Sequence, residues 1–141
     1  MATRSRIAIE SKEGRVKSIY SHWDGYPEHN GKILFEHYQD SDKLTKLIEL
    51  GSISILAPEV KTDQPHSFDK PVEGVVVAYG RDRGESDVEF RYHANAEDFF
   101  LGDIEQWGYL FTKEGVWKVK SCTSDEIQNL EDVLNKTKVL G

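Results

Sequence analysis

Cysteine is nearly absent from this sequence, since Cys122 is the only one among 141 residues. A single thiol forms neither an intramolecular disulfide nor a thiolate zinc site, and such usage is typical of a reducing compartment. We interpret Cys122, which follows an apolar stretch, as a small buried hydrophobic residue. Long apolar runs are absent too: none approaches the roughly 20 residues of a membrane span, and no apolar segment follows the charged start. The sequence therefore predicts a cytoplasmic protein without membrane association.

Basic residues are in the minority, because 18 Lys and Arg stand against 25 Asp and Glu, which gives a formal net charge of −7. Phosphate backbones repel such a surface unless its cations cluster, so we expect no direct nucleic-acid binding. Three catalytic motifs are missing as well: the nucleophile elbow, the phosphate-binding loop and the dinucleotide fingerprint. The sequence therefore favours a non-enzymatic protein over an enzyme, and it predicts no catalytic residue and no cofactor.

What is present fits an ordinary globular chain, and the length suits one domain spanning residues 1–141. Period-2 alternation predicts strands at residues 6–10, 87–92 and 107–111, and a valine-rich run predicts a buried strand at residues 74–79. Turns precede two further predicted strands at residues 16–22 and 116–120, and a short strand is predicted at residues 53–56. Helical spacing predicts helices around residues 33–38, 44–48, 99–104 and 127–134. Most strands follow one another as hairpins with helices between them. The expected fold is α+β: an antiparallel sheet of about five strands built from hairpins, with three to four helices packed mainly on one face.

Capping and turn residues sharpen these boundaries. Asn30 and Asn95 are predicted N-caps of the first and third helices, and Gly51 is predicted to end the second in a left-handed conformation. Residues 123–126 resemble a capping box before the last helix. Residues 80–86 are predicted to form the charged tip of a hairpin that joins strands 74–79 and 87–92. Trp107, Tyr109 and Phe111 share one side of a strand and are predicted to belong to the core.

Residues 22–31 form the stretch richest in reactive side chains, between a predicted strand and a predicted helix. Its glycines and proline favour a loop, and loops held by rigid elements are where binding residues concentrate. Two aromatic rings here could contact a protein or a small ligand, or simply close the edge of the core. The predicted binding residues of this loop are His22, Trp23, Asp24, Tyr26, Glu28 and His29.

Two further interpretations stay open. His22, Asp24, Glu28 and His29 are nitrogen and oxygen donors of the kind that divalent metals accept, although they lack the spacing of an established metal motif. Arg81, Asp82 and Arg83 could bind an anion through two guanidinium groups, or could form a solvated tip with local ion pairs. We include Arg81, Asp82 and Arg83 among the candidate binding residues.

Three segments carry a resemblance to a known family: residues 1–7 (MATRSRI), residues 18–28 (SIYSHWDGYPE) and residues 80–85 (GRDRGE). They resemble a family of small proteins encoded by tailed bacteriophages and prophages, and the similarity extends as far as residues 109–111. The resemblance implies a biological setting, the cytoplasm of an infected bacterium, and it transfers no catalytic residue. Small phage proteins of this kind commonly bind host factors, including components of antiviral defence.

Two functional hypotheses follow. The first is a phage accessory protein that binds a host protein, with counteraction of an antiviral defence system as one expected role. The alternative is a small-ligand or divalent-metal site, for nucleotide binding or hydrolysis, centred on residues 22–29. It predicts that His22, Asp24, Glu28 and His29 converge on one point. Self-association of the chain is a third possibility.

Overall fold

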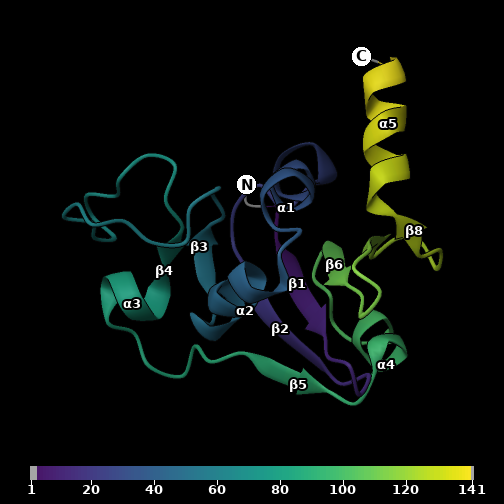
Figure 1. Cartoon of the computed structure of the whole chain (residues 1–141), viewed down its shortest axis with the longest axis horizontal. Coiled ribbons are helices and arrows are strands. Elements are labelled where there is room, and N and C mark those ends of the chain that lie inside the picture. The colour runs from purple at the N-terminus through teal and green to yellow at the C-terminus, as the bar shows by residue number, and fades with distance from the viewer. Residues whose placement is uncertain (1–2, 141) are drawn as a thin grey trace.

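The computed structural model describes the backbone of residues 3–140 and the side chains of residues 3–136. Within that range one sheet contains eight strands: β1 (Ser5–Glu10), β2 (Val16–Ser21), β3 (Ile53–Ile55), β4 (Val77–Ala78), β5 (Arg91–His93), β6 (Trp107–Phe111), β7 (Trp117–Ser121) and β8 (Gln128–Asn129). The described helices are a π-helical turn η1 (Pro27–Gly31), α1 (Lys32–His37), α2 (Ser41–Glu49), α3 (Tyr79–Arg83), α4 (Ala96–Leu101) and α5 (Leu130–Leu140) (Figure 1). The predicted α+β class is confirmed.

The sheet is larger than the predicted five strands, and it is mixed rather than antiparallel. Its order is β4-β3-β2-β1-β6-β7-β8, and β5 pairs with β2 outside this path. The β1–β2 and β6–β7 hairpins are antiparallel, as predicted. However, β1 runs parallel to β6, and β2 runs parallel to β3. The helical connection from β2 through α2 returns the chain in the same direction, which a short hairpin turn cannot do.

The predicted second hairpin is wrong. β4 pairs with β3, and β5 pairs with β2, so these two strands do not meet. The predicted charged tip contains the helix α3 instead. Both β3 and β5 use the same edge of β2, with β3 at Ser21 and β5 at residues 16–18. Local alternation identifies a strand but not its partner, so these pairings could not be chosen from the sequence.

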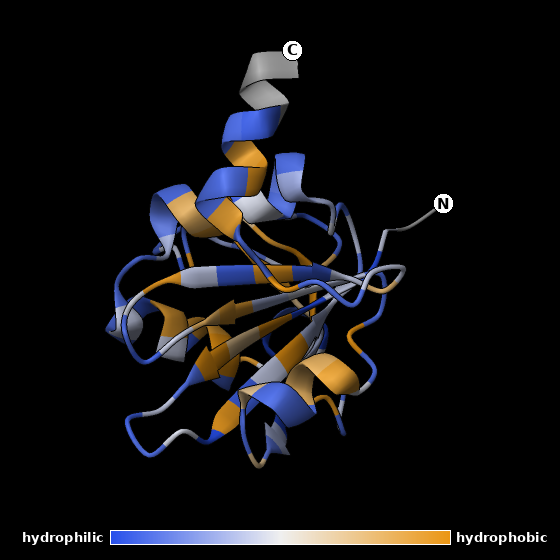
Figure 2. Cartoon of the chain, turned by 90° about the vertical axis from the view of Figure 1, so that its right-hand side faces the viewer, coloured by the Kyte–Doolittle hydropathy of each residue, from blue (hydrophilic) through white to orange (hydrophobic). Residues whose placement is uncertain are grey.

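Apolar side chains cover both faces of the sheet. On one face, Ile7, Ile19 and Tyr109 pack against residues of α1, α2 and α5. On the other face, a smaller cluster joins Ala8 and Leu110 to α4 and its following loop. Figure 2 shows the sheet between these layers, with α5 extending beyond the body of the molecule. The prediction that helices lie mainly on one face is therefore correct for α1, α2 and α5, while α4 lies on the other.

Some predicted helix ends are confirmed and others are wrong. The Asn95 side chain accepts a hydrogen bond from Asp98 N, and Gly51 follows α2 with a φ of +78°. Asn30, in contrast, is buried within η1 and does not cap α1. The predicted capping box lies in the turn between β7 and β8, and the last helix begins only at Leu130. Gln128 and Asn129 pair with β7, so strand pairing delays the start of the helix.

Burial settles two other predictions. Tyr109 and Phe111 belong to the core, and Trp107 packs against it half-buried, as predicted. Cys122 is exposed, so its interpretation as a buried residue is wrong. The chain leaves the core after β7, and the turn that follows carries Cys122 into solvent. Among the described helices none is both long and apolar enough to span a membrane.

Candidate binding surface

The loop that follows β2 is fastened to the sheet through its backbone. His22 N and Trp23 N donate to the carbonyl oxygens of Ile53 and Ser54 in β3, each at 3.1 Å. Gly25 N donates to Thr3 O at 2.8 Å, and the buried Tyr109 hydroxyl donates to Gly25 O at 2.6 Å. These bonds reach three separate parts of the chain. The loop is therefore a fixed feature of the fold.

Several residues of the predicted site serve to shape this loop. A Cβ on Gly25 would lie 2.8 Å from both Ser5 Cβ and Thr3 O, so only glycine fits against β1. Asp24 adopts a φ of +56°, and its carbonyl accepts a hydrogen bond from Asn30 N. The buried Asn30 amide donates to Ser21 Oγ and Trp23 O at 3.2 and 3.3 Å. Asp24, Gly25 and Asn30 thus hold the neighbouring side chains in position.

The aromatic residues of the loop point outward. Trp23 is 42% exposed and Tyr26 is 37% exposed, although their backbones are held in place. The His22 ring meets the Trp23 ring edge-on with centroids 4.8 Å apart. Tyr20 Oη and His22 Nδ1 lie 2.6 Å apart, which fixes the imidazole. The outcome is a rigid and partly apolar surface, which fits a contact role better than a role in closing the core.

The four suggested metal ligands are not gathered. His22 Nδ1 is occupied by Tyr20, and His29 Nδ1 lies 3.0 Å from Asn30 Oδ1. Glu28 lines a separate groove of about 420 Å³ between α1 and α5, beside Phe35 and Leu134. Among the side chains of residues 3–136, no group of three or more His, Cys, Asp or Glu is placed to hold a metal ion. The geometry gives no support to the metal alternative.

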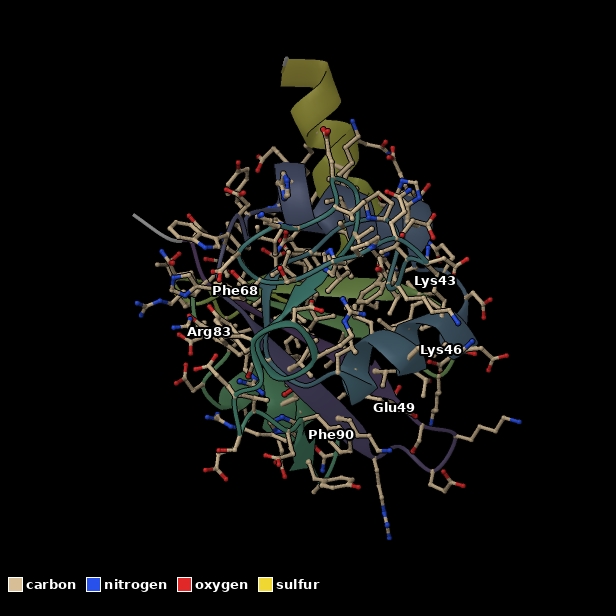
Figure 3. The ribbon with its side chains drawn as sticks, turned by 90° about the vertical axis from the view of Figure 1, so that its left-hand side faces the viewer. Lys43, Lys46, Glu49, Phe68, Arg83 and Phe90 are labelled. Atoms are coloured by element: carbon tan, nitrogen blue, oxygen red, sulfur yellow. The ribbon has the colours of Figure 1, made fainter. Side chains whose placement is uncertain are left out.

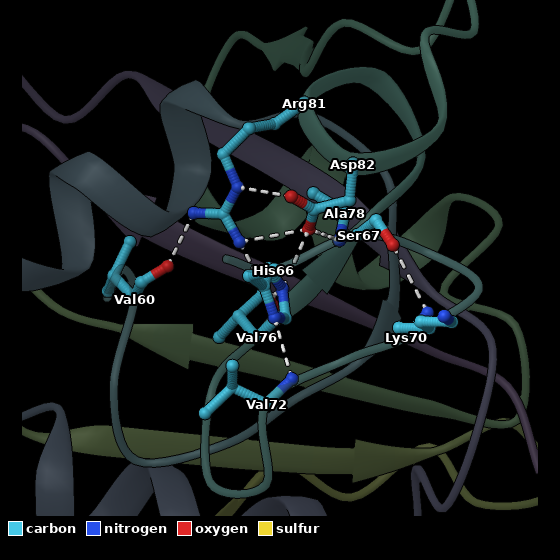
Figure 4. A network of polar contacts seen from close by, with 9 residues as sticks. All are labelled: Val60, His66, Ser67, Lys70, Val72, Val76, Ala78, Arg81 and Asp82. Atoms are coloured by element: carbon cyan, nitrogen blue, oxygen red, sulfur yellow. Dashed lines mark hydrogen bonds and ion pairs between the residues drawn. The ribbon is translucent and has the colours of Figure 1, made fainter. Parts of the chain in front are cut away.

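Arg81 and Asp82 are engaged inside the fold, as Figure 4 shows. The Asp82 side chain is only 4% exposed and accepts hydrogen bonds from Ala78 N at 2.8 Å and from Arg81 Nε at 2.9 Å. Arg81 also donates to the carbonyl oxygens of Val60 and Val76. The pair therefore joins α3 to the long connection before β4, and neither side chain is free to hold an external anion.

His66 completes this network. Its Nδ1 accepts a hydrogen bond from Val72 N at 2.9 Å, so the ring proton is on Nε2, which faces Val76 O and Asp82 Oδ2 at 3.1 and 3.3 Å. Burial alone would raise the pKa of the Asp82 carboxyl. The hydrogen bonds from Arg81 and Ala78, with the charge of Arg81, outweigh burial and hold this pKa below its ordinary value of 3.8.

Arg83, the third charged candidate, remains exposed and lies over the ring of Phe68, 4.9 Å from its centroid. Phe68 in turn lies 5.6 Å from the Tyr79 ring. Figure 3 shows Phe68 and Arg83 side by side, away from Lys43 and Lys46 on α2. The strand registers place Tyr20 of β2 and Tyr79, which follows β4, on either side of Ser52, whose carbonyl accepts a hydrogen bond from Tyr79 N at 3.2 Å. Burial is the largest cause that raises the pKa of Tyr20.

Tyr20 therefore connects the two candidate regions. We call the combined set the aromatic surface; its residues are Tyr20, His22, Trp23, Tyr26, Phe68, Tyr79 and Arg83. Sequence analysis missed Tyr20, Phe68 and Tyr79. The spacing of Tyr20 in β2 and His22 directly after the strand was a usable signal, since residues two apart in an extended chain share a face. No local pattern indicated Phe68, because it lies in a connection without regular structure.

No family model, curated protein or solved structure matches this chain.

Proposed function

We propose that this chain is a non-enzymatic accessory protein of a tailed bacteriophage, which binds a host protein in the bacterial cytoplasm through its aromatic surface. Counteraction of an antiviral defence system is the role we propose for that binding. The phage setting comes from the sequence resemblance. The protein-binding role is supported by one main observation: Trp23 and Tyr26 are exposed on a loop whose backbone is fastened to the sheet.

Rigid, exposed aromatic residues are suited to protein recognition. Tryptophan, tyrosine and arginine are the residues that most often dominate binding energy at protein interfaces. A side chain on a fixed backbone also loses less conformational entropy on binding than one on a mobile loop. Trp23 and Tyr26 meet both conditions, and Arg83 adds a cation whose guanidinium is already placed over Phe68. A partner that presents apolar groups near a carboxylate would complement this surface.

Affinity capture from a bacterial lysate tests the proposal if the variants are matched. The test variant carries Trp23→Ala and Tyr26→Ala. The control carries Tyr92→Ala and Leu101→Ala, which remove two side chains that are 70% and 74% exposed elsewhere. Circular dichroism would first establish that both variants are folded. We expect the test variant to lose at least about 30-fold in affinity, since a hot spot contributes 2 kcal/mol or more, and we expect the control to bind like the wild type.

A photo-crosslinking residue at position 26 would show that the contact is direct, with position 92 as the control site. Recovery of the same host protein by the test variant and the wild type would contradict the proposal. So would the failure of the wild type to retain any host protein.

A further inference from the structure

Arg6 is a cation buried in the sheet, and no carboxylate of the described residues forms an ion pair with it. It is in β1, on the face opposite α1 and α2, and only 3% of it is exposed. Its neighbour on β2 is Tyr20, and its neighbour on β6 is Gly108. A Cβ on Gly108 would lie 2.9 Å from the Ile104 side chain, so the glycine allows Ile104 to cover this part of the sheet.

The hydrogen bonds of Arg6 use only part of its guanidinium. Nε donates to Ser18 Oγ at 2.9 Å, and Nη2 donates to Ser18 O at 3.1 Å. Nη1 has no hydrogen-bond partner among the described residues, yet it is not sealed from solvent. No carboxylate of the described residues lies within ion-pair distance of Arg6. Buried arginines are normally paired, because removing a lone charge from water is costly.

Two further basic groups meet at the same place. His93 Nε2 lies 2.7 Å from Ser18 Oγ, the atom that also accepts from Arg6. Arg91 is paired with Ser18 in the β2–β5 register, and its side chain is exposed beside this cluster. Burial and the Arg91 charge lower the pKa of Arg6 to about 10, so the two cations oppose each other. The cluster of Arg6, Ser18, Arg91 and His93 opens to solvent at β5.

Acidic groups around this cluster only partly balance it. Glu105 and Asp103, in the loop before β6, act on Arg6 electrostatically without forming an ion pair. Asp98 of α4 acts in the same way on His93. Burial together with the charges of Arg6 and Arg91 outweighs Asp98 and keeps the pKa of His93 below its ordinary value of 6.5. The neighbouring cations and burial therefore both oppose protonation of His93.

We propose that Arg6, Arg91 and His93 form a binding site for a tetrahedral oxyanion, specifically a phosphate group. The free Nη1 group of Arg6 would donate to one oxygen, and the Arg91 guanidinium would approach from the exposed side. Protonated His93 would donate to another oxygen after releasing Ser18 Oγ. This site adjoins the aromatic surface at Tyr20, the β2 neighbour of Arg6, but it does not depend on the function proposed above.

The proposal includes a specific link to pH. A bound dianion stabilises the imidazolium, so phosphate binding raises the pKa of His93 and takes up a proton. Affinity for phosphate should then increase as the pH falls below 7, although phosphate itself becomes less charged. Sulfate, which remains a dianion over this range, separates the two titrations.

Nuclear magnetic resonance titration with inorganic phosphate tests the site, using sodium chloride at matched ionic strength as the reference. We expect saturable shifts of the Arg6 Nε–Hε, Ser18 and His93 signals. Arg91→Gln is the main variant because its side chain is exposed, and it should weaken phosphate binding about threefold. Lys46→Gln makes the same change of charge on α2, across the sheet (Figure 3), and should leave the affinity unchanged. Arg6→Gln should abolish saturation if the variant folds.

A second readout is the His93 titration followed by its ring proton signals. Its pKa should be higher in saturating phosphate or sulfate than in chloride. Shifts that grow linearly with phosphate and match those of chloride would overturn the proposal. Equal affinities for the wild type and Arg91→Gln, or a His93 pKa that ignores the anion, would overturn it as well.

Discussion

Replacing Tyr109 with phenylalanine tests how the aromatic loop is held to the sheet. Tyr109 is fully buried in β6, and its hydroxyl donates to Gly25 O at 2.6 Å. Phenylalanine keeps the ring and its packing but leaves the Gly25 carbonyl without this donor. A buried polar group left unpaired costs about 1–3 kcal/mol. Tyr109→Phe should destabilise the fold by that amount.

The expected change in melting temperature follows from the size of the chain. With 141 residues and about 2.1 cal/mol/K per residue, the entropy of unfolding is about 0.3 kcal/mol/K. Tyr109→Phe should therefore lower Tm by about 3–10 °C, measured by calorimetry, with an unchanged slope in urea titrations.

Tyr38→Phe is the control, because it removes a buried tyrosine hydrogen bond at a place other than the aromatic loop. The Tyr38 hydroxyl is also buried and donates to Ala57 O at 2.7 Å, away from the aromatic loop. Both variants should lose comparable stability. Only Tyr109→Phe should accelerate hydrogen exchange at the amides of Gly25 and Asn30, which bond within or next to the loop. A Tm within 1 °C of the wild type, or equal exchange in both variants, would show that Tyr109 does not fasten the loop.

Three other predictions concern the scaffold. Gly51→Ala should destabilise the fold by more than about 2 kcal/mol, because its Cβ would lie 2.1 Å from Val88 O. Gly84→Ala is the control: its φ is similar, +77°, but its Cβ would meet open space, so it should cost about 1 kcal/mol. Equal losses of unfolding free energy in urea titrations would contradict this prediction. Because the pKa of Asp82 is lowered in the folded state, its ionised carboxylate adds to the free energy of unfolding above pH 3.8, and this stabilisation is lost as the pH falls below that value. Asp82→Asn should therefore have a lower free energy of unfolding at pH 7 than the wild type, and it should lose less of it on acidification. The pKa of His93 is also lowered in the folded state, so the unfolded chain binds more protons and stability should fall as the pH drops below 6.5. In thermal melts at a series of pH values, His93→Gln should show a weaker dependence of Tm on pH than the wild type.

The sequence by itself determined the local elements and one part of the site. Alternating apolar residues located the β1–β2 and β6–β7 hairpins, since a half-buried strand must alternate. Asn95 and Gly51 marked helix ends through their own side-chain chemistry and backbone freedom. The density of aromatic and glycine residues after β2 identified the loop that carries Trp23 and Tyr26. Each of these features depends on neighbours in the chain, which is the information that a sequence contains.

Only the tertiary structure decided how these pieces meet. The parallel pairings of β1 with β6 and β2 with β3 depend on the path of long connections, which no local pattern encodes. Tertiary contacts placed Asp82 inside a network with His66 and Arg81, although the sequence presented it as a charged turn. They also brought His93 of β5 to Arg6 and Ser18 of the β1–β2 hairpin, 75 positions away from Ser18 in the sequence. A side chain's electrostatic role is set by which charges and carbonyl groups surround it, and that arrangement exists only after the sheet has formed.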